Sequence, residues 1–422
     1  MRAIRSSILI LSLVMVTACQ MIPDKIDPSK ITSINILDRN GLSQTISTKD
    51  RLGEYNRTNF LAPQPYQKVM RVYGREKSGD VRAQITSYHP NGEIKQYLEA
   101  SNNRANGQYC EWFPNGQLKI QAYVIGGAAD LNTGAEESWL FDGLNHAWDE
   151  EGHFIAEIPY SKGVISGVAH FYHPNGNLWK ETPYSKNCIH GEQKIYLSDG
   201  TLLQKTEYKE GLKDGEAVRY WDNEQVAYYE ISVQGNLSEA AYYNFSGQLV
   251  SEIKNGTGFR AIFDKEGVQE LQEFKKGVQD GVVKVFDNSS RLARTYSIER
   301  EEKVGEEIDY FPGTKQNKLL LTWHKGVLQG PVKTWYKEGN LESQREMSQN
   351  KKNGLLTAWY RTGALMMVEE YDCDQLLKGE YYRMGEKIPI SKIENGKGVA
   401  TLFNSDGNFL KKIHYESGRP VE

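Results

Sequence analysis

Large apolar residues recur along most of the chain at a spacing of about 24 residues. Gly167, Gly191 and Gly215 each open one unit of this pattern, with an aromatic residue five places later and a large apolar residue eleven places later. The fifth places hold Tyr88, Trp112, Trp148, Tyr172, Tyr196, Tyr220, Tyr243, Phe263, Phe286, Tyr310, Trp335, Trp359 and Phe403. The eleventh places hold Ile94, Leu118, Phe154, Leu178, Leu202, Val226, Leu249, Leu292, Leu341, Leu365 and Phe409.

Each unit predicts a β-hairpin, as the unit at Gly191 shows. Residues 192–197 and 201–208 are short runs separated by Ser198-Asp199-Gly200, and Asp-Gly tolerates the positive φ of a tight turn. A helix is disfavoured because Gly ends each run after six or seven residues. One hairpin is marginal in water, so we expect successive hairpins to stack and to bury their aromatic residues in a ladder. The fifth and eleventh places then lie across the turn from each other.

The pattern predicts an all-β fold: an elongated, single-layer antiparallel solenoid of about fourteen tandem hairpins, with no self-sufficient core. We expect the array to span residues 79–422. Glu224 and Ser290 stand where a turn Gly is expected, Ser238 replaces an opening Gly, and the unit at Gly379 is short. A Gly- and Ala-rich insertion near residues 126–137 is expected to be a loop.

Residues 31–78 are predicted to form a small α+β cap on the end of the array. Residues 31–37, 43–46 and 68–73 have the pattern of strands. Ser47 followed by Asp50 resembles a capping box that opens a short helix through Tyr55.

The first 18 residues have the pattern of a signal peptide, with Arg2 and Arg5 before a short apolar run. Val16-Thr17-Ala18-Cys19 resembles the lipobox of bacterial lipoproteins. That resemblance implies cleavage before Cys19, lipidation of Cys19 and anchoring in the membrane through acyl chains such as palmitate. Gln20, which is not the Asp that retains lipoproteins in the inner membrane, favours the outer membrane, and residues 19–30 would be the lipidated Cys and a tether. The alternative is an ordinary cleaved signal with an incidental Cys.

Composition and motifs offer little chemistry. The net charge of −4 provides no basic footprint for nucleic acid. We find no HExxH, CxxC or GxSxG motif, and we expect no catalytic residue, metal or cofactor, and infer no small-molecule substrate. The acidic run that includes Glu301, Glu302, Glu306 and Glu307 is expected to be a solvated edge. Cys110, Cys188 and Cys373 are too far apart along such a sheet to form an intramolecular disulfide.

Several turns resemble a known repeat family. Tyr88-His-Pro-Asn-Gly92-Glu-Ile94, Tyr172-His-Pro-Asn-Gly176-Asn-Leu178 and Tyr208-Lys-Glu-Gly211 are similar to the bacterial variant of the MORN repeat. The resemblance covers roughly residues 83–418. It implies a scaffold or interaction platform, sometimes one that contacts lipid. Many bacterial members carry an antitoxin label, which would need a cytosolic toxin, and the signal peptide argues against that role.

Three functions stay open on the sequence alone. The first is a non-enzymatic, lipid-anchored scaffold at the outer membrane, facing the periplasm or the exterior, that binds unknown protein partners. Trp139 and Phe141, in the least repeat-like loop, are the candidate binding residues. The second is a periplasmic antitoxin or immunity-like protein that sequesters one toxin. The third is a hydrolase with its site in the cap.

Overall fold

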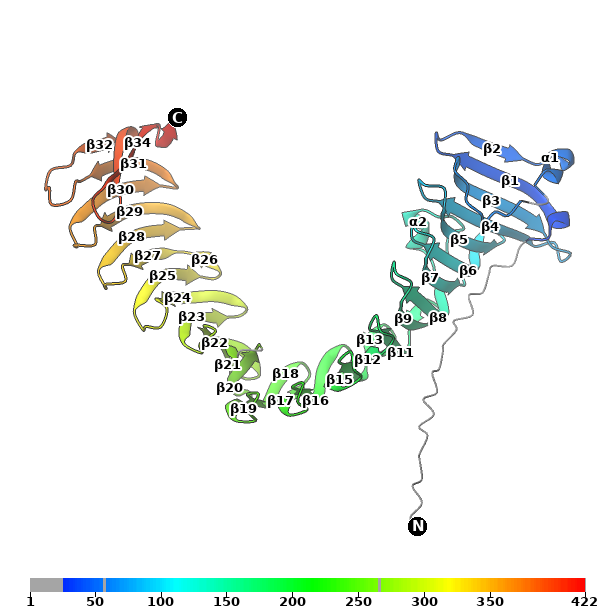
Figure 1. The fold of residues 1–422 in the computed structure, drawn as a ribbon, viewed down its shortest axis with the longest axis horizontal. Coiled ribbons are helices and arrows are strands. Elements are labelled where there is room, and N and C mark those ends of the chain that lie inside the picture. Colours follow the sequence, from blue (N-terminus) through cyan, green and yellow to red (C-terminus); the bar gives the residue numbers. More distant parts are fainter. Residues whose placement is uncertain (1–25, 56–57, 265–266, 422) are drawn as a thin grey trace, which may run out of the picture. The chain divides into compact units, whose positions relative to one another are not determined.

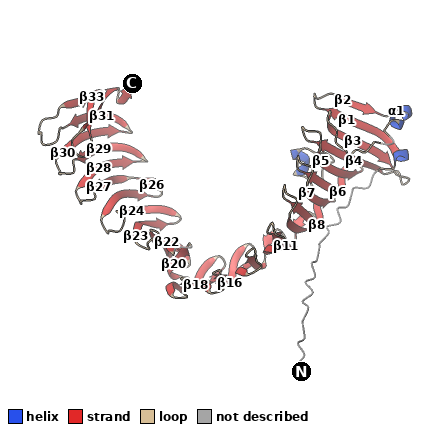
Figure 2. Ribbon diagram, viewed as in Figure 1, coloured by secondary structure: helices blue, strands red, loops and turns tan. Residues whose placement is uncertain are grey.

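The computed structural model describes residues 26–55, 58–264 and 267–421, and β-strands dominate it. In these described ranges the strands form one open antiparallel sheet of 35 strands, and the short helices all lie near the N-terminal end (Figures 1 and 2). The predicted fold class, an antiparallel array of tandem hairpins, is confirmed. The chain divides into two compact units, one ending at Gly176 and the other beginning at Asn177.

The first unit contains η1 (Pro28–Lys30), β1 (Ile31–Asp38), β2 (Ser43–Ile46), α1 (Lys49–Gly53), β3 (Gln67–Arg75), β4 (Val81–Tyr88), β5 (Ile94–Ser101), β6 (Arg104–Trp112), β7 (Leu118–Val124), α2 (Thr133–Glu136), β8 (Phe141–Trp148), β9 (Phe154–Ser161), β10 (Val164–Ile165) and β11 (Gly167–Tyr172).

The second unit contains β12 (Leu178–Ser185), β13 (Cys188–Ile189), β14 (Gly191–Tyr196), β15 (Leu202–Lys209), β16 (Leu212–Tyr220), β17 (Val226–Val233), β18 (Asn236–Tyr243), β19 (Leu249–Lys254), β20 (Thr257–Phe263), β21 (Val268–Lys275), β22 (Val278–Phe286), β23 (Leu292–Glu299), β24 (Glu302–Tyr310), β25 (Asn317–His324), β26 (Val327–Leu328), β27 (Gly330–Trp335), β28 (Leu341–Ser348), β29 (Lys351–Trp359), β30 (Leu365–Asp372), β31 (Gln375–Tyr381), β32 (Ser391–Glu394), β33 (Lys397–Phe403), β34 (Phe409–Glu416) and β35 (Arg419–Val421).

Two kinds of turn alternate along the array. Within a unit, a longer turn places the fifth-place residue opposite the eleventh-place residue, as in Trp112 opposite Leu118 and Trp335 opposite Leu341. The predicted ladder therefore has its expected register. Its rings also touch: the Trp148 and Phe154 ring centroids are 5.6 Å apart, and those of Phe154 and Tyr172 are 5.0 Å apart.

Between units, the chain turns on two residues that both have positive φ, the signature of a type I′ hairpin. Lys276-Gly277 is one example, with Lys275 paired to Val278. Such turns lie at residues 102–103, 162–163, 186–187, 210–211, 234–235, 255–256, 276–277, 300–301, 325–326, 349–350, 373–374, 395–396 and 417–418. Because this turn follows the right-handed twist of the strands, it repeats without disturbing the register.

The most deeply buried row of the sheet is not the aromatic ladder. It consists of the residues two and fifteen positions after the opening residue of each unit. These residues lie directly opposite one another on neighbouring strands. In the second unit the row reads Gln193, Thr206, Ala217, Glu230, Ala240 and Ile253. We call this set the buried row. Thr206, Ala217 and Ala240 have small side chains.

The N-terminal end has a real core, which corrects the expectation of none. On the aromatic face, Tyr97 and Tyr88 pack with Ile34 and Met70 beneath the partly buried residues Leu52, Tyr55, Phe60 and Leu61. On the opposite face, Leu98 and Tyr109 pack beneath Trp139 of the insertion. Both faces of this end are therefore covered, and β3 pairs with β4, so the sheet continues past residue 78.

Two local predictions need correction. Helix α1 begins after Thr48, which makes no side-chain cap, so the expected capping box at Ser47 and Asp50 is wrong. The helix ends at Gly53 and not at Tyr55. The insertion predicted as a loop contains α2, capped by the Asn132 side chain, which accepts from the Ala135 N–H at 3.0 Å. Among the described residues, no helix has the length and apolarity needed to cross a membrane.

Candidate functional site

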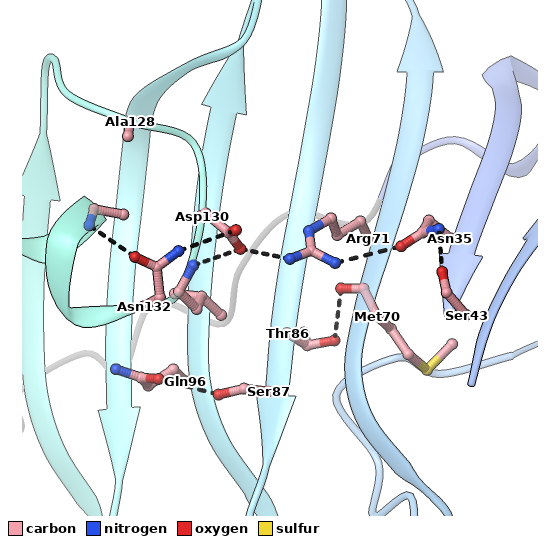
Figure 3. Close-up of polar contacts among 12 residues, drawn as sticks. Asn35, Ser43, Met70, Arg71, Thr86, Ser87, Gln96, Ala128, Asp130 and Asn132 are labelled. Carbon is pink, nitrogen blue, oxygen red and sulfur yellow. Dashed lines mark hydrogen bonds and ion pairs between the residues drawn. The ribbon is translucent and has the colours of Figure 1, made fainter. Parts of the chain in front are cut away.

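The insertion between β7 and β8 is fixed to the sheet by a polar chain (Figure 3). Asp130 accepts from the Arg71 guanidinium of β3 at 2.6 Å, and Arg71 also donates to Asn35 of β1 at 3.3 Å. Asn132 donates to the second oxygen of Asp130 at 3.1 Å. The Arg71 side chain of β3 therefore links the insertion to the sheet.

Asp130 has a shifted acidity. Partial burial favours the neutral acid, but the hydrogen bond and charge of Arg71, helped by the Leu131 N–H, outweigh it and hold the pKa of Asp130 below its usual value. The ion pair is therefore present at neutral pH.

The structure places the two predicted binding residues inside this cover. Trp139 is only 7% exposed, its indole N–H donates to the Ala128 carbonyl at 2.9 Å, and its ring lies 4.8 Å from that of Tyr109. Phe141 is half-buried at the start of β8 and packs on Tyr160. Trp139 thus holds the insertion on the sheet and does not offer its ring to a partner. A binding role for this loop stays a prediction.

A groove of about 500 Å³ opens beside the turns of the β6–β7 and β8–β9 hairpins. Ile120, Ala147 and Ile155 provide its apolar wall, while Lys119 and Glu151 provide charge. Lys119 is held by Glu111 at 2.8 Å. A volume in this range suits a side chain of a partner or a small ligand. Sequence reasoning missed the groove, because its residues come from two hairpins whose turns meet only in the folded sheet.

Asp149 and Glu151, which line the groove, lie close enough to His153 for the three side chains to hold a metal ion. The Asp149 carboxylate, however, already accepts from the backbone N–H groups of Glu151 and His153 and contacts the His153 ring at 2.9 Å. The same side chain-to-backbone turn recurs at Asp287 and Asn404 without any histidine. We therefore interpret this cluster as turn chemistry.

An apolar strip of Leu140, Leu144, Pro159 and Val168 runs from the residue before β8 across β8, β9 and β11. Leu140, Leu144 and Val168 are exposed, and Pro159 is half-buried. Leu144 is 53% exposed and pairs with Pro159. Gly167, next to Val168, lies against the Pro159 ring, and Gly163 lies against Leu140. The strip therefore joins three neighbouring strands of the first unit into one surface.

Buried carboxylates occur in the second unit and serve the sheet. Glu307 is 4% exposed and contacts Lys303 at 2.6 Å and the Trp323 indole N–H at 2.8 Å. The expectation that Glu307 belongs to a solvated edge is therefore wrong, although Glu306 is exposed. Most of the acidic run lies on β24, and successive residues of a strand point to opposite faces of the sheet.

Glu230 and Glu369 stand at the same place in their units, on the buried row. Glu230 accepts from the Tyr242 hydroxyl at 2.7 Å and lies 3.2 Å from the Arg260 guanidinium. Burial, followed by the nearby Glu230 charge, raises the pKa of Tyr242 far above its ordinary value. Each carboxylate is satisfied by neighbours, which is the pattern of a structural network.

The described cysteines are free thiols, with Cys110 buried and Cys188 and Cys373 exposed. Burial, and then the charge of Glu99, raises the pKa of Cys110 to about 12, so it is unreactive at neutral pH. Cys19, the predicted lipidation site, and the predicted signal peptide lie outside the described residues.

Comparison with known families matches three parts of the chain. Residues 105–125, 166–186 and 189–210 match the MORN repeat variant. Each match covers two successive strands and the turn between them, namely β6 and β7, β11 and β12, and β14 and β15, so the matched stretches are repeats of the kind that the sequence resembles.

No curated protein matches the chain significantly. Among solved structures, a Photorhabdus luminescens Tc holotoxin pore is similar at 11% identity and a TM-score of 0.14. The alignment covers 92% of this chain but only 24% of that one. With so low a TM-score, the likeness carries no weight for fold or function.

Proposed function

We propose that this protein is a non-enzymatic repeat scaffold that binds protein partners, attached to the bacterial outer membrane through a lipid on Cys19. The observation that carries the binding function is the apolar strip of Leu140, Leu144, Pro159 and Val168. Water-facing apolar side chains on neighbouring strands mark an interaction surface when they form one patch. The matches to the MORN repeat variant support a scaffold.

The chemistry of the strip favours a protein partner. Its side chains are aliphatic. An apolar centre of this kind is typical of the buried part of a protein interface.

Site-specific photo-cross-linking in intact cells tests this function. A benzophenone amino acid at Leu144 should capture one protein reproducibly, whereas the same probe at the exposed Lys95 of β5 should not. Equal labelling from the two positions, or none from Leu144, would refute binding through the strip.

The anchor is tested separately. Cys19→Ser should move the protein from the membrane fraction to the soluble envelope fraction while leaving the Leu144 cross-link possible in vitro. Membrane retention of this variant would contradict the lipid anchor and not the binding surface.

The antitoxin alternative predicts a different result in the same experiment. The captured protein would then be a single toxin, and loss of the chain would stop growth only in cells that make the toxin. Normal growth of toxin-producing cells that lack this protein would exclude the antitoxin alternative.

A further inference from the structure

The groove beside the turns of the β6–β7 and β8–β9 hairpins has an apolar lining suited to a long side chain. Ile120, Ala147 and Ile155 are its aliphatic part, and Phe113 and Trp148 add two half-buried aromatic side chains. Its volume of about 500 Å³ lies in the range of ligand sites. The methylene stem of a long charged residue packs favourably on such a surface while its charged end stays near water.

Three successive acidic residues add negative charge to the same groove, namely Asp149, Glu150 and Glu151. The Asp149 carboxylate is occupied within its own turn, but among the described residues no ion pair involves Glu150 or Glu151. Lys119, which also lines the groove, is neutralised by Glu111, because their charged atoms lie 2.8 Å apart. The groove therefore carries a net negative charge that complements a cation.

The two turns that form the groove are fixed before any ligand binds. The Asn115 side-chain amide of the first turn donates to the Glu150 carbonyl of the second at 2.8 Å. Within the second turn, Asp149 accepts from the backbone N–H groups of Glu151 and His153. A groove held in this way needs little rearrangement on binding, which lowers the cost of ordering a ligand.

From this lining we infer that the groove binds an arginine side chain of a protein partner. A guanidinium group stacks on an aromatic ring and pairs with a carboxylate through two parallel hydrogen bonds, which a lysine ammonium cannot do. The lining already contains one such contact, because the Lys119 ammonium lies 5.7 Å from the centre of the Phe113 ring. Trp148 offers a second ring, and Glu150 and Glu151 offer the carboxylates. The site rests on the proposed function, since the arginine belongs to a protein partner, but it shares no residue with the apolar strip.

NMR of the purified protein with isotope-labelled isoleucine methyl groups tests the site, with the peptide acetyl-Gly-Arg-Gly-amide as the probe. The methyl signals of Ile120 and Ile155, assigned with Ile120→Val and Ile155→Val, should shift with a Kd on the order of 1 mM. The same peptide with citrulline in place of arginine is similar in shape but uncharged, and it should bind at least about 5-fold more weakly. Unshifted signals from both methyl groups, or equal affinity for the two peptides, would overturn the inference.

Replacing both free carboxylates, Glu150→Gln with Glu151→Gln, should weaken binding of the arginine peptide by about 5-fold. Glu301→Gln with Glu302→Gln is the matched control, because these two exposed glutamates are also adjacent in the sequence and their replacement changes the net charge equally. This control should retain the wild-type affinity, and circular dichroism shows that each variant is folded. Equal weakening in the two double variants would show that the peptide responds to overall charge and that the groove holds no arginine site.

The peptide titration and the photo-cross-linking at Leu144 can fail independently. A Leu144 cross-link without peptide binding would refute the arginine site and leave the scaffold function standing. Peptide binding without a Leu144 cross-link would support the arginine site and refute binding through the strip.

Discussion

At the scale of single residues, backbone conformation determines what each turn position tolerates. The second residue of the turns between units has positive φ whether it is glycine or not, as in Gly277 (φ 82°) and Glu301 (φ 69°). A residue with a Cβ pays about 1–2 kcal/mol to adopt that conformation. The array therefore keeps its turn geometry even where the sequence departs from it, and the surrounding ladder enforces it.

Glu301→Gly should stabilise the protein by about 1 kcal/mol, because glycine adopts positive φ without strain. Urea denaturation followed by circular dichroism measures the change. The reciprocal control is Gly326→Ala at the same turn position, with φ 73°, which should destabilise by a similar amount. Two shifts of the same sign would show that φ is not the cause.

Glu307→Ala should destabilise the protein by about 1–3 kcal/mol, because it leaves the Lys303 ammonium and the Trp323 indole N–H without their buried acceptor. Glu306→Ala, one residue earlier and exposed, should change stability by less than about 0.5 kcal/mol. Comparable losses in the two variants would contradict the assignment of Glu307 to the interior.

These residues also show what the sequence can and cannot predict. The hairpins and the pairing of Trp112 with Leu118 followed from Gly spacing and local turn chemistry. The burial of Glu307 did not, because its partners Arg294 and Trp323 lie on neighbouring strands. The burial of Trp139 did not follow from the sequence either, because the Tyr109 ring that it packs against lies on another strand of the sheet. Short stretches of sequence determine the strands and turns, whereas the burial of a side chain depends on residues that are distant in the sequence.

At the scale of elements, the opening glycine of a unit controls how one hairpin follows another. Gly107, Gly215 and Gly281 have φ between 112° and 131°, and a Cβ at each would collide with a glutamate of the preceding unit. The same glutamate accepts from the next backbone N–H, as Glu207 does from Glu216 at 3.1 Å. At Gly167 and Gly191 a proline takes the place of the glutamate.

Gly215→Ala should destabilise the protein by about 2 kcal/mol, because the new Cβ would lie 1.9 Å from a Glu207 oxygen and φ is 112°. Adding Glu207→Ala should recover part of the loss by removing the clash but not the backbone strain. A double-mutant cycle in urea measures this coupling. Additive losses would show that Glu207 does not crowd the glycine.

The attachment of the insertion should depend on pH. Because the pKa of Asp130 is lowered by folding, its ion pair stabilises the attachment above the unfolded pKa of about 3.9, and this contribution is lost as pH falls through the folded value. The effect is at most about 1 kcal/mol, since Asp130 is 36% exposed. Hydrogen exchange of residues 126–140 should therefore lose protection at acid pH, whereas Asp130→Asn should show weaker protection without this dependence.

At the scale of the molecule, the two units differ in how they bury apolar surface. The first has a cover on each face of its N-terminal strands, with Phe60 and Leu61 on one side and Trp139 on the other. The second has smaller clusters, such as the one around Tyr242 and Ile253, spread along the sheet. We therefore expect the first unit to hold the slowest-exchanging amides.

Deleting the 24 residues Gly191–Asp214 should leave a folded protein, because Gly215 then follows His190 in the position that Gly191 occupied. The β-signal per residue in circular dichroism should stay unchanged. Deleting only residues 191–202 removes half a hairpin and should cause unfolding or aggregation. Equal behaviour of the two deletions would refute a register set by whole hairpins.

The two-residue turn that joins successive hairpins has an evolutionary consequence. Since the junctions built on this turn present the same backbone to the next hairpin, slippage of the gene by one whole repeat adds or removes a hairpin without changing its neighbours. Lineages can therefore lengthen or shorten the array by copying DNA, while the insertion between β7 and β8 stays unchanged near the amino terminus.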